Sequence, residues 1–335
     1  MLRLPAKQIL TLLVIGIAGN SCSSVRRSGS GEADAKSSRT VGKDNDFYYD
    51  IGGFHRAVTT KSSEAPRWFD RGLAMRYAFN YEEAVRCFEY ALEEDPSMPM
   101  TLWGMAYAWG PNINNLEIPA HQIAQAALAL RLAEFQSKRT TKLERDLIEA
   151  LGNRYSVPAP DDRKPLNKAY SDAMRNVHKE NGDAPLIAFL FTESLMILRP
   201  WNHWSKDGKP AIETPEIMEV LERALEKNPE YPALCHLYIH TMEASPTPGK
   251  ALPAANRLRN AMPGAGHLVH MPSHIDVLIG DYKTAVTANQ KAIMADAEFI
   301  RHEGVNKFFG VIGWLKYPLH VVCVHGAVSA HSVGV

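Results

Sequence analysis

Small and large side chains recur at fixed spacing between Ala65 and Pro96. The small residues Gly72 and Ala84 would let two consecutive helices approach closely, and aromatic side chains would fill the remaining space. These aromatic residues are Trp68, Tyr81 and Phe88. A helix that runs toward Pro96 would end there, because proline cannot continue it. This segment therefore predicts two short antiparallel helices joined by a tight turn.

The same spacing resembles the tetratricopeptide repeat (TPR), a helix–turn–helix unit of about 34 residues. With Ala65 as position 1, the matching positions are held by Trp68, Gly72, Tyr81, Ala84, Phe88, Ala91 and Pro96. The pattern returns with interruptions, from Ser97, around residues 183–229, from Pro232 and from Gly266. Residues 141–155 look like an inserted helix. We therefore predict an all-α, TPR-type solenoid over residues 46–300, with about five units and with insertions.

Charge and composition narrow the classes of function. Hydrophobic residues make up 45% of the chain and charged residues 22%, as in ordinary globular proteins. Lys and Arg number 37, equal to Asp and Glu, and no basic block stands out in the part expected to fold. Binding to nucleic acid normally needs such a block, so we expect no nucleic-acid partner.

Residues 1–22 resemble an export signal. Arg3 and Lys7 precede the short apolar run from Ile9 to Gly19, and Cys22 follows it. This order predicts a bacterial lipoprotein acylated at Cys22, although Gly19 stands where leucine is usual; plain secretion and an uncleaved anchor are alternatives. Residues 23–45 are rich in Ser, Gly and charge and predict a flexible tether. We expect an exported protein, periplasmic or held to the membrane only by its lipid.

The helical pattern fades near the other end of the sequence. Residues 301–335 are expected to form an irregular tail, because the stretch from Tyr317 onward has no charged residue and no turn signal. A solenoid normally ends on a polar outer face. We interpret this tail as a truncated or frame-shifted reading; a β-prone segment that pairs with a partner is the alternative.

Five of the 13 histidines fall between positions 236 and 274. They occur with a glutamate at spacings of three and four residues, which place side chains on one helix face. Neighbouring helices pack about 8–10 Å apart, so two such faces could share one ion. Imidazoles with a carboxylate suit a divalent transition metal: Zn, Cu, Fe or Mn. The candidate metal ligands are His236, His240, Glu243, His267, His270 and His274.

The TPR resemblance implies that positions 2, 5, 9 and 12 of each first helix face a concave groove, and all six candidates fall there. A polar groove for a peptide, or simple packing, would also explain them. Pro272 lies inside the first helix of the last unit and predicts a kink or a late start. Trp201 and Trp204 lie in a loop that either roofs the groove or packs on itself.

No standard catalytic motif is present; the sequence "HEGVN" at His302 lacks the second histidine of H-E-x-x-H. The phrases "HLYIHTMEASP" and "GHLVHMPSHI" resemble a group of exported bacterial TPR proteins, and TPR proteins in general are similar in being scaffolds. We therefore predict an exported scaffold that binds a protein or peptide in its groove and also carries the metal. The alternatives are a metal-dependent enzyme, hydrolase or oxidoreductase, and a copper- or zinc-handling protein.

Overall fold

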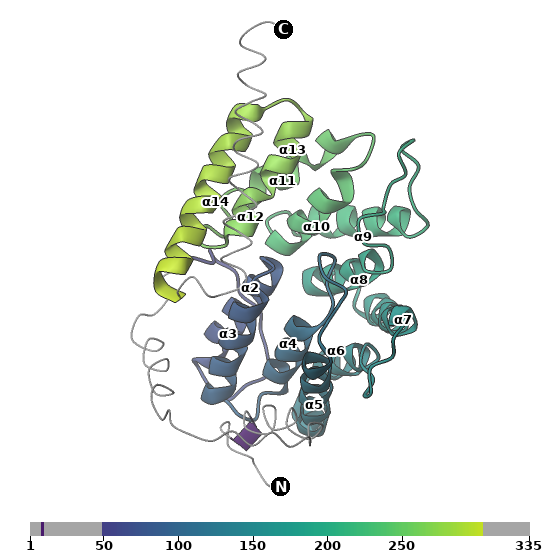
Figure 1. The fold of residues 1–335 in the computed structure, drawn as a ribbon. Coiled ribbons are helices and arrows are strands. Elements are labelled where there is room, and N and C mark those ends of the chain that lie inside the picture. Colours follow the sequence, from purple (N-terminus) through teal and green to yellow (C-terminus); the bar gives the residue numbers. More distant parts are fainter. Residues whose placement is uncertain (1–7, 10–48, 304–335) are drawn as a thin grey trace, which may run out of the picture.

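A computed structural model describes residues 8–9 and 49–303 of the chain. Apart from residues 8–9, the expected export signal lies outside these residues, as do the acylated Cys22, the tether and the tail beyond residue 303. Over residues 49–303 the chain forms helices and no strand, arranged as a TPR-like solenoid, so the predicted fold class is confirmed (Figure 1). No helix in the described ranges combines the length and the apolar character needed to cross a membrane.

Successive helices pack against one another along the chain (Figure 1). The helices are α2 (Ala65–Tyr77), α3 (Tyr81–Glu94), α4 (Pro99–Trp109), α5 (Ala120–Gln136), α6 (Lys142–Gly152), α7 (Lys164–Asn181), α8 (Pro185–Met196), α9 (Thr214–Lys227), α10 (Pro232–Met242), α11 (Leu252–Leu258), α12 (Gly266–His270), α13 (Pro272–Leu278) and α14 (Tyr282–Glu303). The last helix continues to Glu303, slightly past the predicted boundary at residue 300.

The first unit, α2 with α3, follows the packing that its sequence predicts. A Cβ atom added to Gly72 or to Gly104 of α4 would lie 2.5 or 2.6 Å from the ring of Phe88. Such distances are too short for carbon atoms, so three helices meet around this ring only because both residues are glycine. The side chain of Asn80 accepts a hydrogen bond from the backbone N–H of Glu83 and caps α3.

The segment predicted as an inserted helix has a partner of its own. This segment is α6, which begins with a capping box between Thr141 and Glu144 and packs on α7. The helix α7 was not predicted from the sequence. Most residues of α7 are polar, and its buried apolar side chains are few: Tyr170, Met174 and Val177. They lie four and three residues apart, as on one helix face, but the polar residues between them obscure this pattern.

Pro272 interrupts the first helix of the last unit, as predicted. The helix α12 ends at His270 and α13 begins at Pro272, with Met271 between them in helical conformation. Proline has no N–H to continue the hydrogen-bond ladder, and its ring displaces the preceding turn. The break places His267 and His270 on one short helix and His274 on the next.

Candidate functional site

The structure brings all six predicted residues into one cluster, here called the histidine cluster, in which four histidines are buried and Glu243 and His274 are half-buried. The helix α10 carries His236 and His240 and ends next to Glu243, while α12 and α13 carry the other three. His236 and His270 are 0% exposed, and His240 and His267 are 3% exposed. Such burial excludes bulk water from these four imidazoles. The members of the cluster are His236, His240, Glu243, His267, His270 and His274.

Three of these histidines meet closely enough to share an ion. One ring nitrogen from each of His236, His240 and His267 lies within 4.8 Å of the other two. The Nε2 atoms of His236 and His267 are 3.1 Å apart. Two nitrogens bound to one tetrahedral zinc at 2.0–2.1 Å would be separated by roughly 3.3 Å. The pair therefore already has nearly the spacing of two ligands, whereas a nitrogen of His240, within 4.8 Å of both, would have to come closer to be the third.

Glu243 contacts the Nδ1 atoms of two of the imidazoles. Its Oε1 is 2.8 Å from Nδ1 of His240, and its Oε2 contacts Nδ1 of His274. Burial opposes ionisation of Glu243, but hydrogen bonds from His240 and His274, together with their charge, outweigh it and hold its pKa well below the usual range. An ionised carboxylate only accepts hydrogen bonds, so both Nδ1 atoms must carry hydrogen. In the neutral ring, each Nε2 then keeps its lone pair.

Asn289 of α14 fixes the tautomer of His270, as Glu243 does for His240 and His274. Its Nδ2 donates to the carbonyl of Ala285 at 2.8 Å, which leaves Oδ1 to face Nδ1 of His270 at 2.6 Å. The Nδ1 of His270 is therefore the donor, and its Nε2 has the lone pair. This Nε2 lies 2.9 Å from Nε2 of His274, which also carries a lone pair and no hydrogen in the neutral ring. Two lone pairs at this distance repel each other unless a proton or a metal ion lies between them.

Two strained aromatic residues pack on the histidine cluster. Phe79 and Trp201, with φ of 59° and 60°, are the non-glycine residues with positive φ in the described chain. Bulky residues rarely adopt this conformation, which costs free energy and is concentrated at functional sites. The centroid of the Phe79 ring lies 4.7 Å from that of His236 and 4.8 Å from that of His267. Trp201 meets His240 edge-on at 5.3 Å, so the loop does contact the cluster.

Sequence reasoning missed three residues of this region: Phe79, Asn289 and His203. His203 is buried in the loop that carries Trp201; burial, together with the nearby charge of His240, lowers its pKa to about 4. It is therefore neutral at neutral pH. Asn289 could have been found, because it is a polar residue where the repeat expects a core side chain. The backbone strain at Phe79 leaves no comparable mark in the sequence.

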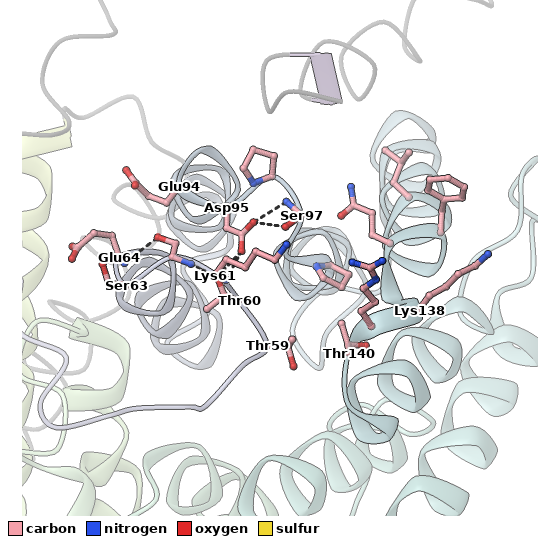
Figure 2. A pocket seen from close by; sticks show the side chains of 17 residues that line it. Thr59, Thr60, Lys61, Ser63, Glu64, Glu94, Asp95, Ser97, Lys138 and Thr140 are labelled. Atoms are coloured by element: carbon pink, nitrogen blue, oxygen red, sulfur yellow. Dashed lines mark hydrogen bonds between the residues drawn. The ribbon is translucent and has the colours of Figure 1, made fainter. Parts of the chain in front are cut away.

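A large cavity lies elsewhere in the described structure, near the ends of α2, α3 and α5 (Figure 2). It measures about 1040 Å³, and none of the clustered histidines lines it. Asp95 at its wall accepts hydrogen bonds from the hydroxyl of Thr60 and the backbone N–H groups of Lys61 and Ser97, at 2.7–3.0 Å (Figure 2). These bonds tie the segment before α2 to the α3–α4 turn. Because these hydrogen bonds of Asp95 have a structural role, they do not indicate a ligand site. The histidine cluster is therefore the better candidate site.

Comparison with known proteins identifies one repeat. The family model of the tetratricopeptide repeat matches residues 65–98, which contain α2, α3 and the turn that follows. The chain therefore contains a TPR unit, and its other helix pairs continue a TPR-like arrangement. Repeats of this family generally mediate interactions between proteins. The search of curated proteins returned no match.

Proposed function

We propose that this chain is a TPR scaffold whose histidine cluster holds one divalent transition metal ion: Zn, Cu, Fe or Mn. His236, His240 and His267 would be its ligands. The observation that carries the proposal is the convergence of these three histidines, each with one ring nitrogen within 4.8 Å of the other two. Glu243 holds Nδ1 of His240 and so leaves its Nε2 lone pair for an ion, while Asn289 holds Nδ1 of the neighbouring His270. Carboxylates and amides behind metal-bound histidines commonly act in this way.

In this proposal Glu243 orients the ligand His240 and does not itself bind the ion. Both of its oxygens accept hydrogen bonds from imidazoles. His270 and His274 form a second pair beside the three ligands, with ring centroids 6.1 Å from His267 and 6.0 Å from His240, respectively. They would complete a buried shell of imidazoles around the ion.

The scaffold would bind a protein or a peptide on the concave face of the solenoid, and the metal would organise the wall of that face. The repeat at residues 65–98 supports a protein partner. The proposal also places the protein outside the cytoplasm, as a periplasmic protein or as a lipoprotein anchored through Cys22. The sequence of residues 1–22 supports this location.

One observation favours a second function, that of a metal-dependent enzyme. Structural zinc sites usually have four protein ligands, whereas catalytic sites have three and leave one position for water or substrate. The three histidines that come closest together in the described residues are such a set. A metal held by them would supply a Lewis acid or an activated water for a hydrolase, or a redox centre for an oxidoreductase.

Elemental analysis of the purified protein tests the metal proposal. The full chain, prepared without a metal-affinity column, is expected to carry about one equivalent of Zn, Cu, Fe or Mn. His267→Ala should lose the metal while keeping its helical circular dichroism. His121→Ala removes an exposed histidine of α5 and should keep the metal. Absence of metal from the parent protein after reconstitution, or retention of metal by His267→Ala, would refute the proposal.

A further inference from the structure

A second buried polar cluster lies between α2, α3, α4, α7 and α8, here called the arginine cluster. Two arginines and one glutamate form its charged part, and Arg76, Arg154 and Glu193 are all 0% exposed. Tyrosines surround them: the guanidinium carbon of Arg76 lies 4.1 Å from the ring centroid of Tyr107, and that of Arg154 lies 4.9 Å from that of Tyr170. The members of the cluster are Arg76, Tyr81, Tyr107, Arg154, Tyr170 and Glu193.

One of the two arginines is balanced. Nη2 of Arg76 donates to Oε1 of Glu193 at 3.0 Å, and its Nε donates to the carbonyl of Tyr107 at 3.4 Å. The other carboxylate oxygen of Glu193 accepts a hydrogen bond from the hydroxyl of Tyr107. One buried positive charge therefore has one buried negative charge beside it, with hydrogen bonds between them.

Arg154, in contrast to Arg76, has no ion pair with a carboxylate among the described residues. Its Nε, Nη1 and Nη2 atoms are all buried, and none has a hydrogen-bond partner in the described chain. The guanidinium cannot lose its proton in a protein, so this is a buried cation with its whole donor fork unused. Burying a charge without a partner is costly, and folded proteins rarely keep one without a use.

Further donors near Arg154 are unused as well. Nη1 of Arg76 and the hydroxyls of Tyr81 and Tyr170 are buried and lack a hydrogen-bond partner among the described residues. The guanidinium carbon of Arg76 lies 4.9 Å from the ring centroid of Tyr81, as that of Arg154 does from Tyr170. Burial raises the pKa of both tyrosines, although the charges of Arg76 and Arg154 oppose this shift. The two hydroxyls therefore stay protonated at neutral pH. Within the cluster, one guanidinium fork, one further N–H group and two O–H groups lack an acceptor among the described residues. Arg163, whose Nη2 donates to the backbone carbonyl of Arg154 at 3.0 Å, adds Nε and Nη1, which are buried and also lack one there.

We propose that Arg154, Nη1 of Arg76 and the hydroxyls of Tyr81 and Tyr170 bind an oxyanion, the carboxylate or phosphate group of a small ligand. Within the cluster the two arginines exceed the single glutamate by one positive charge, and Arg163 next to Arg154 adds another; an anion would offset this excess. The flat fork of arginine matches two oxygens of a carboxylate or a phosphate. A site without bulk water strengthens this attraction.

This oxyanion site goes beyond the metal proposal and does not depend on it. Two aromatic rings connect the two clusters: the ring of Tyr81 stacks on that of Phe79 at 5.9 Å, and Phe79 stacks on His267 at 4.8 Å. The guanidinium carbon of Arg76 lies over the Tyr81 ring, 4.9 Å from its centroid. The two sites could therefore serve one ligand, but each can be tested alone.

Thermal unfolding of the full chain, kept metal-free with a chelator, tests the oxyanion site. Phosphate and acetate are compared with chloride at equal ionic strength. At a concentration far above the dissociation constant, a bound anion is expected to raise the unfolding midpoint by about 2–5 °C. A rise with phosphate alone identifies a phosphate group, and a rise with acetate identifies a carboxylate. Because the protein is metal-free, the result stands whatever the metal analysis shows.

Arg154→Met should abolish the rise, since methionine fills similar space without charge or donors. Arg175→Met is the matched control, because Arg175 also lies on an aromatic ring, that of Phe191 at 5.0 Å, but forms an ion pair with Glu216. It should leave the rise intact. Tyr170→Phe removes one hydroxyl and should reduce the rise, which gives a second readout if Arg154→Met does not fold. No rise with either anion, or an unchanged rise in Arg154→Met or Tyr170→Phe, would refute the oxyanion site.

Discussion

The first unit (α2 and α3) and the last unit (α12, α13 and α14) share one repeat pattern but differ in what they bury. Tyr81 and Tyr282 occupy the same repeat position, and so do Ala84 and Ala285. Both second helices are capped, by the side chain of Asn80 in the first unit and by that of Asp281 in the last. The residues that set the helix–turn–helix geometry are therefore the same in both.

The difference lies in the interior. At the position where the first unit has Phe88, packed between glycines, the last unit has Asn289, hydrogen-bonded to His270. The position of Gly72 is held by Ser273, whose hydroxyl also reaches His270. Both replacements put polar groups where the repeat pattern expects close packing. This local departure from the pattern marks the candidate site, as expected where function competes with stability.

The largest effect on stability is expected in the first unit. Phe88→Ala should lower the free energy of unfolding by about 3–5 kcal/mol, because it leaves a cavity between Gly72 and Gly104 that rigid helices cannot close. Urea denaturation followed by circular dichroism measures this loss. Asn289→Ala, at the equivalent position, removes two hydrogen bonds and should cost only about 1–3 kcal/mol. Equal losses in the two variants would contradict the contrast between an apolar and a polar interior.

The next largest effect concerns one repeat position with opposite electrostatics in the two units. Asp95 and Asp296 are equivalent in the pattern. Burial opposes ionisation of Asp95, but hydrogen bonds from Lys61, Ser97 and Thr60 outweigh it and lower its pKa. Burial alone raises the pKa of Asp296 to about 7. The Oδ2 atom of Asp296 has no hydrogen-bond partner in the described residues.

The two carboxyls should therefore give opposite pH dependence. Protonated Asp296 is favoured in the folded state, so its contribution to stability is complete below about pH 4 and is lost as pH rises through about 7. Asp296→Asn should thus raise the free energy of unfolding above pH 8 by about 3–4 kcal/mol and have little effect at pH 4. Asp95→Asn should instead lower stability at neutral pH, and its effect should fade in acid. Unfolding measured from pH 4 to 9 checks both signs; parallel pH profiles for the two variants would contradict the assignment.

A smaller effect is expected from the carboxylate behind the histidines. Glu243→Gln keeps one acceptor oxygen but replaces the other with an NH₂ group, so Nδ1 of His240 and of His274 can no longer both donate to it. One imidazole should change tautomer, and metal affinity should fall by about 10–100-fold. Competition with a metal-binding dye measures the affinity. The exposed Glu219→Gln of α9 is the control and should bind metal like the parent protein; a parent-like Glu243→Gln would show that Glu243 does not orient ligands.

The sequence predicted the scaffold better than the chemistry of its interior. Spacing alone placed His236 with His240 and His270 with His274, since residues four apart share a helix face. It could not show that Glu243 lies between two imidazoles, because that depends on side-chain rotamers and on the break at Pro272. The arginine cluster was missed for a related reason: Arg76, Arg154 and Glu193 are far apart in sequence and lie on segments with no shared motif. Only the packing of α2 and α8 with the segment that follows α6 brings them together.

The smallest expected effect returns to the turn between the two helices of each unit. Phe79, with φ of 59°, occupies the repeat position of Gly280, with φ of 85°. Glycine adopts this conformation without a steric penalty, so Phe79→Gly relieves strain of roughly 1–3 kcal/mol but loses the ring contacts with the histidines. These terms nearly cancel, and the free energy of unfolding should change by no more than about 1 kcal/mol. Metal affinity should nevertheless fall, because the ring holds His236 and His267 in place. Urea denaturation and metal competition on the same variant separate the two effects; a loss of stability above 3 kcal/mol with unchanged affinity would show that Phe79 serves the core and not the site.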